Sequence, residues 1–180
     1  SAQDTGVTSS DFSQIELRVA AAFAEEEVLL EAFNSDRCPH TEVAAKMLGK
    51  VVEDVSPEER YSAKAVNFGI LNGMGANRLA LALKQDKPTA NRFLTEYKKN
   101  LPALHEWMEK TWREAERFRI IRTVAGRTRI FSSQEDTRPA VSVVVQGSAA
   151  ELMHQALVAV SDSNLAPILS VHDEILIPGQ

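Results

Sequence analysis

Cysteine is almost missing from this chain of 180 residues, which contains Cys38 alone. A lone cysteine cannot form an internal disulfide, and no second cysteine or paired histidine stands near it at metal-ligand spacing, so we expect no role for it. Long apolar runs are missing too. None approaches the roughly 20 residues of a membrane helix, and the polar segment 1–10 does not resemble a signal peptide. These absences predict a cytoplasmic protein with no membrane partner.

Positive charge is in deficit, because the net charge is -5 at pH 7. Surfaces that bind nucleic acid gain affinity from Lys and Arg, so the sum argues mildly against such a partner. The distribution argues the other way, since seven basic residues and only two acidic ones lie between positions 110 and 129. A solvated basic face explains this stretch as well as a DNA-binding face does, and both interpretations stay open.

The order of predicted elements indicates an α+β protein with neither internal repeats nor a low-complexity linker. A short strand over 7–12 runs into a helix over 15–23, which places Asp11 where the strand meets the helix. The clearest helix start is Ser56-Pro57-Glu58-Glu59, a capping box with proline at the first helical position, and it predicts a helix over 57–71. Further helices are predicted over 26–34, 41–48, 77–84, 89–100, 102–119 and 146–161, the last as a core helix. A hairpin is expected around Gly126, and two short strands over 168–171 and 175–177.

His172, Asp173 and Glu174 occupy the predicted turn between the last two strands. Carboxylates held by such a turn remain open to solvent and suit a hard cation such as Mg²⁺. If the first and last strands share a sheet, Asp11 and Asp173 come together although 162 positions separate them. From the triplet alone, an ordinary polar turn is the simpler explanation.

Arg60, Lys64 and Phe68 follow one another at intervals of four residues, so they form one stripe along the helix predicted over 57–71. Two cations and a ring in this order could hold a triphosphate and stack against its base. A solvated face would accommodate the two cations but gives no reason for the ring.

Taken together, these segments resemble the three catalytic motifs of the family A, DNA polymerase I-like, DNA polymerases. Asp11-Phe12-Ser13-Gln14-Ile15-Glu16-Leu17-Arg18 is similar to motif A, Arg60, Lys64, Asn67, Phe68 and Gly69 to motif B, and Val171-His172-Asp173-Glu174 to motif C. Three shorter matches accompany them in the family order, at 40–42, 126–129 and 146–151. The ordered set covers nearly the whole chain and is highly specific.

The resemblance implies a role for each matching position. Asp11 and Asp173 would bridge two Mg²⁺ ions with the Phe12 carbonyl as a further ligand, while Glu174 supports the site. The incoming deoxynucleoside triphosphate would be held by a set that includes the catalytic lysine, namely Gln14, His40, Arg60, Lys64 and Phe68. Glu16 would exclude a ribose 2′-hydroxyl. Primer-template DNA would be contacted by Arg18, Asn72, Gln146 and His172.

The family fold implies a small antiparallel palm sheet and a mostly helical fingers region, with palm at 1–33, fingers at 34–110 and palm again at 111–180. The implied reaction is template-directed extension of a primer by a monomer. Asn72 stands where the family usually has tyrosine, and the stretch between Phe131 and Gln146 is shorter than in typical members. Without a thumb or exonuclease segment before motif A, the chain is expected to be an incomplete enzyme. A polymerase-derived DNA-binding module without useful catalysis is the alternative, and a two-metal nuclease would leave the stripe on 57–71 unused.

Overall fold

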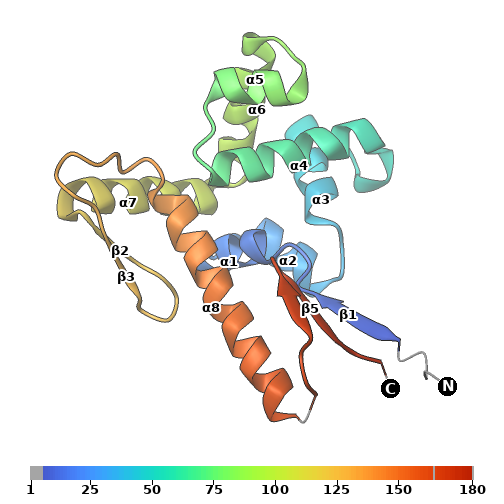
Figure 1. Cartoon of the computed structure of the whole chain (residues 1–180). Helices are drawn as coiled ribbons and strands as arrows, with labels where there is room; N and C mark the ends of the chain where they lie inside the picture. The colour runs from blue at the N-terminus through green and yellow to red at the C-terminus, as the bar shows by residue number, and fades with distance from the viewer. Residues whose placement is uncertain (1–5, 164, 180) are drawn as a thin grey trace.

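The computed structural model describes residues 6–163 and 165–179, and it combines many helices with small antiparallel sheets, so the predicted α+β class is confirmed (Figure 1). The helices are α1 (Ile15–Ala24), α2 (Glu27–Asn34), α3 (Pro39–Leu48), η1 (Val52–Asp54), α4 (Pro57–Leu71), α5 (Ala76–Leu83), α6 (Lys87–Asn100), α7 (Pro102–Phe118) and α8 (Ala140–Asp162). The strands are β1 (Val7–Asp11), β2 (Ile120–Arg122), β3 (Thr128–Ile130), β4 (Leu169–Val171) and β5 (Glu174–Pro178).

The larger sheet joins the two ends of the described chain. Its order is β1-β5-β4, with both pairs antiparallel. Asp11 lies opposite Glu174 across one pair, and Val171 lies opposite Glu174 across the other, so the turn between β4 and β5 consists of His172 and Asp173. The predicted meeting of the first and last strands in one sheet is therefore confirmed.

Helix α4 begins and ends where the sequence predicts. Ser56 Oγ accepts a hydrogen bond from the Glu59 backbone N–H at 3.2 Å, and Glu59 Oε2 accepts one from the Ser56 N–H at 2.9 Å. This reciprocal pair satisfies two N–H groups that have no partner within the helix, while proline at the first position needs none. The stripe of Arg60, Lys64 and Phe68 is thus fixed on a well-capped helix.

One hydrophobic core runs through the helical part of the molecule. It takes fully buried side chains from α1, α3, α4, α5 and α7, among them Leu17, Val43, Val66, Leu79 and Leu104. A smaller cluster between α7, the β2–β3 hairpin and the start of α8 is built on Ile121 and Phe131. Because the main core includes helices from all three predicted segments, α1 and α4 are held in a fixed relation through shared packing.

Helix α8 corrects two expectations. It begins at Ala140 and not at 146, and only its first half is core, with Ala140, Val141, Val144 and Val145 buried but Val158 60% exposed. Among the described residues it is also the one helix long and apolar enough by composition to span a membrane, with a mean hydropathy of 1.3 over 18 residues, 28% of them buried. Its first half packs against α1 and α7, as expected of a helix within a globular fold.

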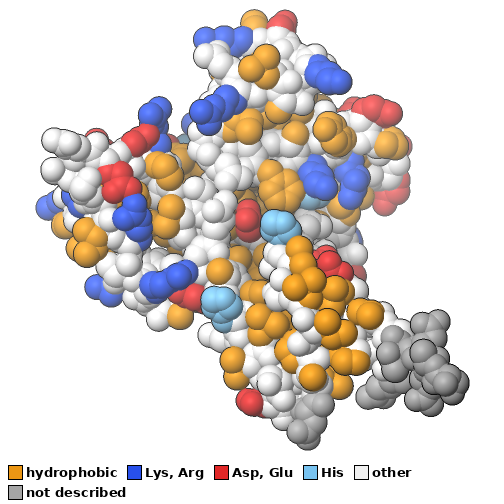
Figure 2. All heavy atoms as spheres, in the orientation of Figure 1, with side chains coloured by type: hydrophobic (Ala, Val, Ile, Leu, Met, Phe, Trp, Pro, Cys, Tyr) orange, Lys and Arg blue, Asp and Glu red, His pale blue; other side chains and the backbone are white. Residues whose placement is uncertain are grey.

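Hydrophobic side chains also gather on the outside of the molecule, over the larger sheet (Figure 2). Val7, Ile168, Leu169 and Val171 are each 42–60% exposed there. A sheet face of this kind is normally covered by another layer.

Candidate active site

Three carboxylates lie at one end of the larger sheet. Asp11 ends β1, Glu174 begins β5 directly opposite it, and Asp173 precedes Glu174 in the turn. The Phe12 N–H donates to the Asp173 carbonyl oxygen at 2.9 Å, which ties the end of β1 to the turn. Glu174 Oε1 accepts a hydrogen bond from Ser9 Oγ on the neighbouring strand. Strand pairing alone therefore brings together residues from opposite ends of the sequence.

A cavity of about 490 Å³ opens beside Asp173, and neither Asp11 nor Glu174 lines it. It is lined by α1, α4, α8 and the β4–β5 turn, and it brings together six residues predicted to bind nucleotide, DNA or metal: Gln14, Glu16, Phe68, Gln146, His172 and Asp173. The remaining lining is apolar, with Ile15, Ala149 and Met153. A cavity with apolar walls and a few convergent polar groups is the usual form of a ligand site.

Two residues of this cavity have strained backbones. Gln14 has φ 58° and His172 has φ 54°, in the left-handed backbone region that residues other than glycine rarely adopt. Gln14 Oε1 is also buried and has no hydrogen-bond partner within the described residues. Strain and an unpaired polar atom both tend to occur where a fold is shaped for a ligand.

Glu16 is the carboxylate of the cavity with a perturbed titration. Burial raises its pKa above the usual value of 4.5, and the nearby charge of Asp173 raises it further. Both effects disfavour the ionised form of Glu16 relative to a solvent-exposed glutamate, and the second places its carboxylate near that of Asp173.

Arg60, Lys64 and Phe68 lie on one face of α4, as predicted, and His40 from α3 joins them. Lys64 Nζ lies 6.0 Å from the centroid of the Phe68 ring, and the His40 ring lies 5.9 Å from it at an angle of 47°. Arg60 and Lys64 are exposed, whereas His40 is only 1% exposed. Two solvent-facing cations therefore stand beside a buried imidazole and a half-buried ring.

His40 has a partner that the sequence analysis did not single out. Asn67 Nδ2 lies 2.8 Å from His40 Nδ1, and both side chains are 1% exposed. Burial, followed by the charges of Arg60 and Lys64, lowers the pKa of His40 to about 4. Asn67 belongs to the motif B match, but the pairing spans 27 positions and two helices, so no local pattern indicates it.

Cys38 was expected to be without a role, yet it contacts the same group of residues. Arg60 Nε lies 3.2 Å from Cys38 Sγ. Burial raises the pKa of the Cys38 thiol, but hydrogen bonds from Thr41 and Arg60 outweigh burial, so the pKa is lowered overall. The thiol therefore helps to hold the Arg60 side chain in place.

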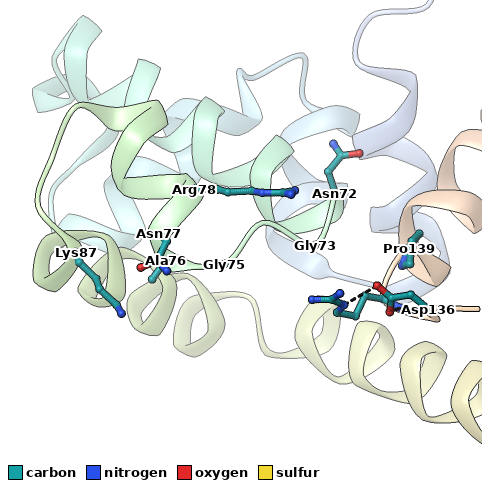
Figure 3. A pocket seen from close by; sticks show the side chains of 10 residues that line it. Asn72, Gly73, Gly75, Ala76, Asn77, Arg78, Lys87, Asp136 and Pro139 are labelled. Carbon is teal, nitrogen blue, oxygen red and sulfur yellow. Dashed lines mark hydrogen bonds and ion pairs between the residues drawn. The ribbon is translucent and has the colours of Figure 1, made fainter.

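Asn72 lies at the end of α4 and is one of the residues that line a second cavity of about 470 Å³ (Figure 3). Its Nδ2 donates to the Phe68 carbonyl oxygen at 2.9 Å, and Gln146 Nε2 donates to its Oδ1 at 3.3 Å. Gln146 itself lines the first cavity. A hydrogen bond between α4 and α8 thus stands between the two cavities.

Arg18 lies apart from the other residues predicted to contact DNA. Its Nε donates to the Ser13 carbonyl oxygen at 2.9 Å, and its guanidinium lies 4.2 Å from the centroid of the Phe33 ring. With Phe12 it lines a separate, mostly apolar cavity of about 500 Å³. The structure therefore does not bring Arg18 into the cavity that holds Gln146 and His172.

Carboxylate and carbonyl oxygens are the ligands that Mg²⁺ takes in proteins, usually one or two carboxylates with the remainder from phosphates or water. Asp11, Asp173 and the Phe12 carbonyl supply such oxygens at one end of the sheet. No group of three or more His, Cys, Asp or Glu arranged to hold a metal ion occurs among the described residues. In chemical type these oxygens are ones that Mg²⁺ accepts, with the remaining ligands left to a substrate or water.

Comparison with known proteins agrees with the motifs. The model of DNA polymerase family A matches residues 1–178. The thermostable DNA polymerase I of Thermus aquaticus is 37% identical over 180 residues, which cover 93% of this chain, and the DNA polymerase I of Pseudomonas aeruginosa is 35% identical over 184 residues, again 93% of the chain. The chain spans 22% and 20% of these relatives.

A solved structure shares the fold. The POL domain of Pol1 from M. smegmatis, in complex with DNA primer-template and dNTP, superposes with a TM-score of 0.88 at 28% identity. The match covers 99% of this chain and 34% of that domain.

Proposed function

Because the chain belongs to DNA polymerase family A, we propose that it forms the part of a polymerase that adds deoxynucleotides to a primer 3′ end under the direction of a template. The observation that carries the proposal is the cavity of about 490 Å³, where α1, α4, α8 and the β4–β5 turn converge next to Asp173. The related M. smegmatis domain binds primer-template and dNTP, which supports the same partners here.

Asp11, Asp173 and the Phe12 carbonyl would hold two Mg²⁺ ions, with Glu174 supporting them from the strand opposite Asp11. When bound, such ions polarise the phosphoryl group and neutralise charge that builds on the attacking and leaving oxygens. The protein's own contribution is placement, since phosphoryl transfer depends mostly on position and charge. Sheet pairing fixes the two strand ends, and the strained turn at His172 keeps Asp173 facing the cavity.

The exposed cations of α4 would bind the triphosphate. Arg60 and Lys64 offer charge-assisted donors, His40 offers a neutral one, and Phe68 provides an apolar wall of the cavity for the base and sugar. Gln14 lines the same cavity and has a buried oxygen without a hydrogen-bond partner among the described residues, which a donor on the nucleotide would satisfy. Glu16 lines the same cavity near Asp173, where it would exclude a 2′-hydroxyl by occupying its space.

DNA would enter along α8 and the end of α4. Gln146 and His172 line the cavity and would contact the primer end, while Asn72 would lie beside the template. Arg18 would have to leave Phe33 or act through the neighbouring cavity to contact DNA. In this scheme segments 1–33 and 111–180 form a palm and 34–110 the fingers, in a monomer that works in the cytoplasm.

The decisive test is primer extension by the full protein that carries these residues. Asp11→Ala and Asp173→Ala should each abolish extension while leaving primer-template affinity within about twofold, because the carboxylates hold metal and do not grip DNA. Lys64→Ala should weaken nucleotide use far more than DNA binding. Undiminished extension by either aspartate variant would remove that residue from the metal site, and a wild-type protein that binds DNA without extending primers would reduce the chain to a DNA-binding module.

A further inference from the structure

The buried pair of Asn67 and His40 is unusual because it leaves one nitrogen of the imidazole without a partner. Asn67 Nδ2 contacts His40 Nδ1, while His40 Nε2 is buried with no hydrogen-bond partner among the described residues. A buried N–H without an acceptor costs free energy, and native proteins keep few of them. An unpaired donor of this kind beside two exposed cations indicates a site for an anionic acceptor.

The protonation state of the ring follows from its surroundings. Burial and the charges of Arg60 and Lys64 keep His40 neutral at pH 7, because its pKa is lowered to about 4. A neutral imidazole carries one proton, which lies on whichever nitrogen does not accept a hydrogen bond. The Asn67 amide donates to Nδ1, so the proton lies on Nε2.

We propose that Asn67 is a positioning residue, whose amide holds the His40 imidazole with its proton on Nε2 as a donor to the phosphates of an incoming nucleoside triphosphate. The inference rests on the proposed function, since it needs a triphosphate at α4. The Phe68 ring lies 5.9 Å from the imidazole, and the charges of Arg60 and Lys64 act on it. An anion that binds to the two cations would displace these side chains and expose Nε2. The fully buried stem of Asn67 keeps its amide from turning away.

The first measurement is direct and needs no nucleotide. Nitrogen-15 spectra of the histidine rings of the 180-residue chain, with His40 identified by its loss in His40→Ala, should show the Nε2-protonated form at pH 7. A ring protonated on Nδ1 would overturn the proposal, because its Nε2 could then not donate to a phosphate.

The second measurement is the dNTP dissociation constant of the full protein with a primer-template whose 3′ end is blocked. Asn67→Leu should weaken dNTP binding by about 10- to 100-fold, the usual effect of losing one hydrogen bond to a charged group. His40→Ala should weaken dNTP binding to the same extent, and the double variant should bind dNTP no more weakly than His40→Ala alone. DNA affinity should stay unchanged in all three.

Val66→Ala is the matched control, since Val66 is the fully buried neighbour of Asn67 and has no polar contact. Val66→Ala should lower Tm at least as much as Asn67→Leu does, yet it should leave the dNTP dissociation constant within about twofold of the wild-type value. If Asn67→Leu and His40→Ala weaken binding independently, or if Asn67→Leu leaves it unchanged while the wild type binds normally, the inference alone fails. If the wild-type protein binds no dNTP, the proposed function fails with it.

Discussion

Glu16 shows how a single residue of the site can oppose the stability of the fold. Burial and the charge of Asp173 raise its pKa, so the folded chain binds a proton more readily than the unfolded chain does. Ionised Glu16 therefore costs stability, and this cost is present above the folded pKa and disappears as the pH falls below the unfolded value of 4.5. A residue kept at such a cost is more easily explained by ligand binding than by folding.

We predict that Glu16→Gln raises the Tm of the metal-free chain at pH 7.5 by about 1–3 °C, because the amide keeps the shape of the side chain without its charge. The gain should shrink toward zero near pH 4. Thermal melts at both pH values in the presence of a chelator measure this effect. Glu114→Gln, on the exposed face of α7, is the control and should change nothing at either pH. An equal gain at both pH values would mean that charge is not the cause.

The same residue should control sugar selection. We predict that Glu16→Ala raises ribonucleotide incorporation by the full protein relative to deoxynucleotide incorporation, by about tenfold or more, because the shortened side chain leaves room beside C2′. Competition between the two nucleotides in single-nucleotide extension gives the ratio. An unchanged ratio would show that Glu16 does not act on the sugar.

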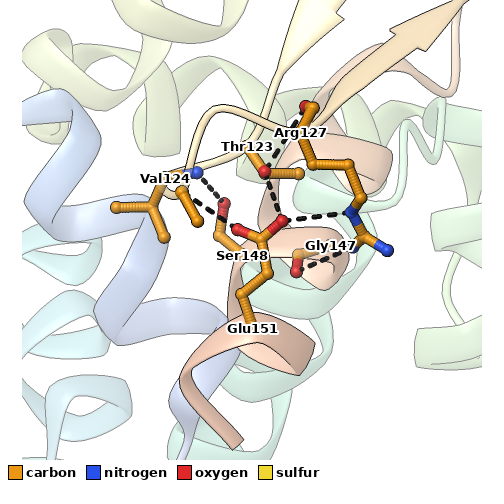
Figure 4. Close-up of polar contacts among 7 residues, drawn as sticks. Thr123, Val124, Arg127, Gly147, Ser148 and Glu151 are labelled. Atoms are coloured by element: carbon orange, nitrogen blue, oxygen red, sulfur yellow. Dashed lines mark hydrogen bonds and ion pairs between the residues drawn. The ribbon is translucent and has the colours of Figure 1, made fainter. Parts of the chain in front are cut away.

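At the scale of elements, hydrogen bonds hold the turn of the β2–β3 hairpin against α8 (Figure 4). The Glu151 carboxylate accepts hydrogen bonds from Thr123 Oγ1 at 2.6 Å, the Ala125 N–H at 3.0 Å and Arg127 Nε at 3.1 Å. Ser148 Oγ accepts one from the Val124 N–H at 2.9 Å. The helix comes so close that a Cβ on Gly147 would lie 2.7 Å from Thr123 Cγ2.

We predict that Glu151→Ala releases the turn and destabilises the chain by about 1–2 kcal/mol, the net worth of hydrogen bonds to a charged group near the surface. Amide exchange at Val124 and Ala125 should accelerate, while exchange in α4 stays constant. The hydrogen bond from Thr123, followed by the other contacts, lowers the pKa of Glu151. Its stabilising effect is thus complete above pH 4.5 and is lost as the pH falls through the lowered pKa. Unaltered amide exchange at Val124 and Ala125 in this variant would show that Glu151 does not hold the turn against α8.

The elements that the sequence predicts best are those with local signals. The capping box at Ser56 predicts the start of α4. The β-branched and small residues of 7–12 predict the strand that ends at Asp11, and the short apolar runs at 168–171 and 175–177 predict the two strands on either side of Asp173. The start of α8 was wrong because Val141 to Val145 is rich in β-branched residues, which favour strands. Their burial at helical spacing overrides that preference: Ala140, Val141, Val144, Val145, Ser148 and Ala149 form one stripe.

The sequence did not predict which side chains contact one another across helices, because such contacts also depend on tertiary packing. The pairs Asn67 with His40, Arg60 with Cys38 and Gln146 with Asn72 each join two elements. Their geometry depends on how the helices pack, and no periodicity along one helix encodes it. Motif matching identified His40, Arg60, Asn72 and Gln146 as site residues, yet their partners became apparent only in three dimensions.

For the molecule as a whole, the basic stretch over 110–129 is less available to DNA than its composition indicates. Arg119 donates to the Ser132 and Glu135 carbonyl oxygens, Arg127 pairs with Glu151, and Arg129 pairs with Glu135. These side chains serve to hold the hairpin and the following loop. Of the seven basic residues, the exposed ones with no hydrogen bond or ion pair among the described residues are Lys110, Arg113, Arg117 and Arg122.

We therefore predict that the isolated 180-residue chain binds primer-template DNA weakly and with a shallow salt dependence. Each phosphate contact contributes about −0.9 to the slope of log K against log salt, so four contacts give a slope of about −4. The net charge of -5 adds a general repulsion from DNA, so little or no primer extension by the isolated chain is expected even at low salt.

Fluorescence anisotropy at several salt concentrations measures the slope. Arg113→Glu with Arg122→Glu should reduce it by about two, whereas Arg129→Gln should loosen the hairpin with little change in slope. A slope of about −6 in the wild-type chain would show that the paired arginines also contact phosphates, and that the hairpin opens when DNA binds.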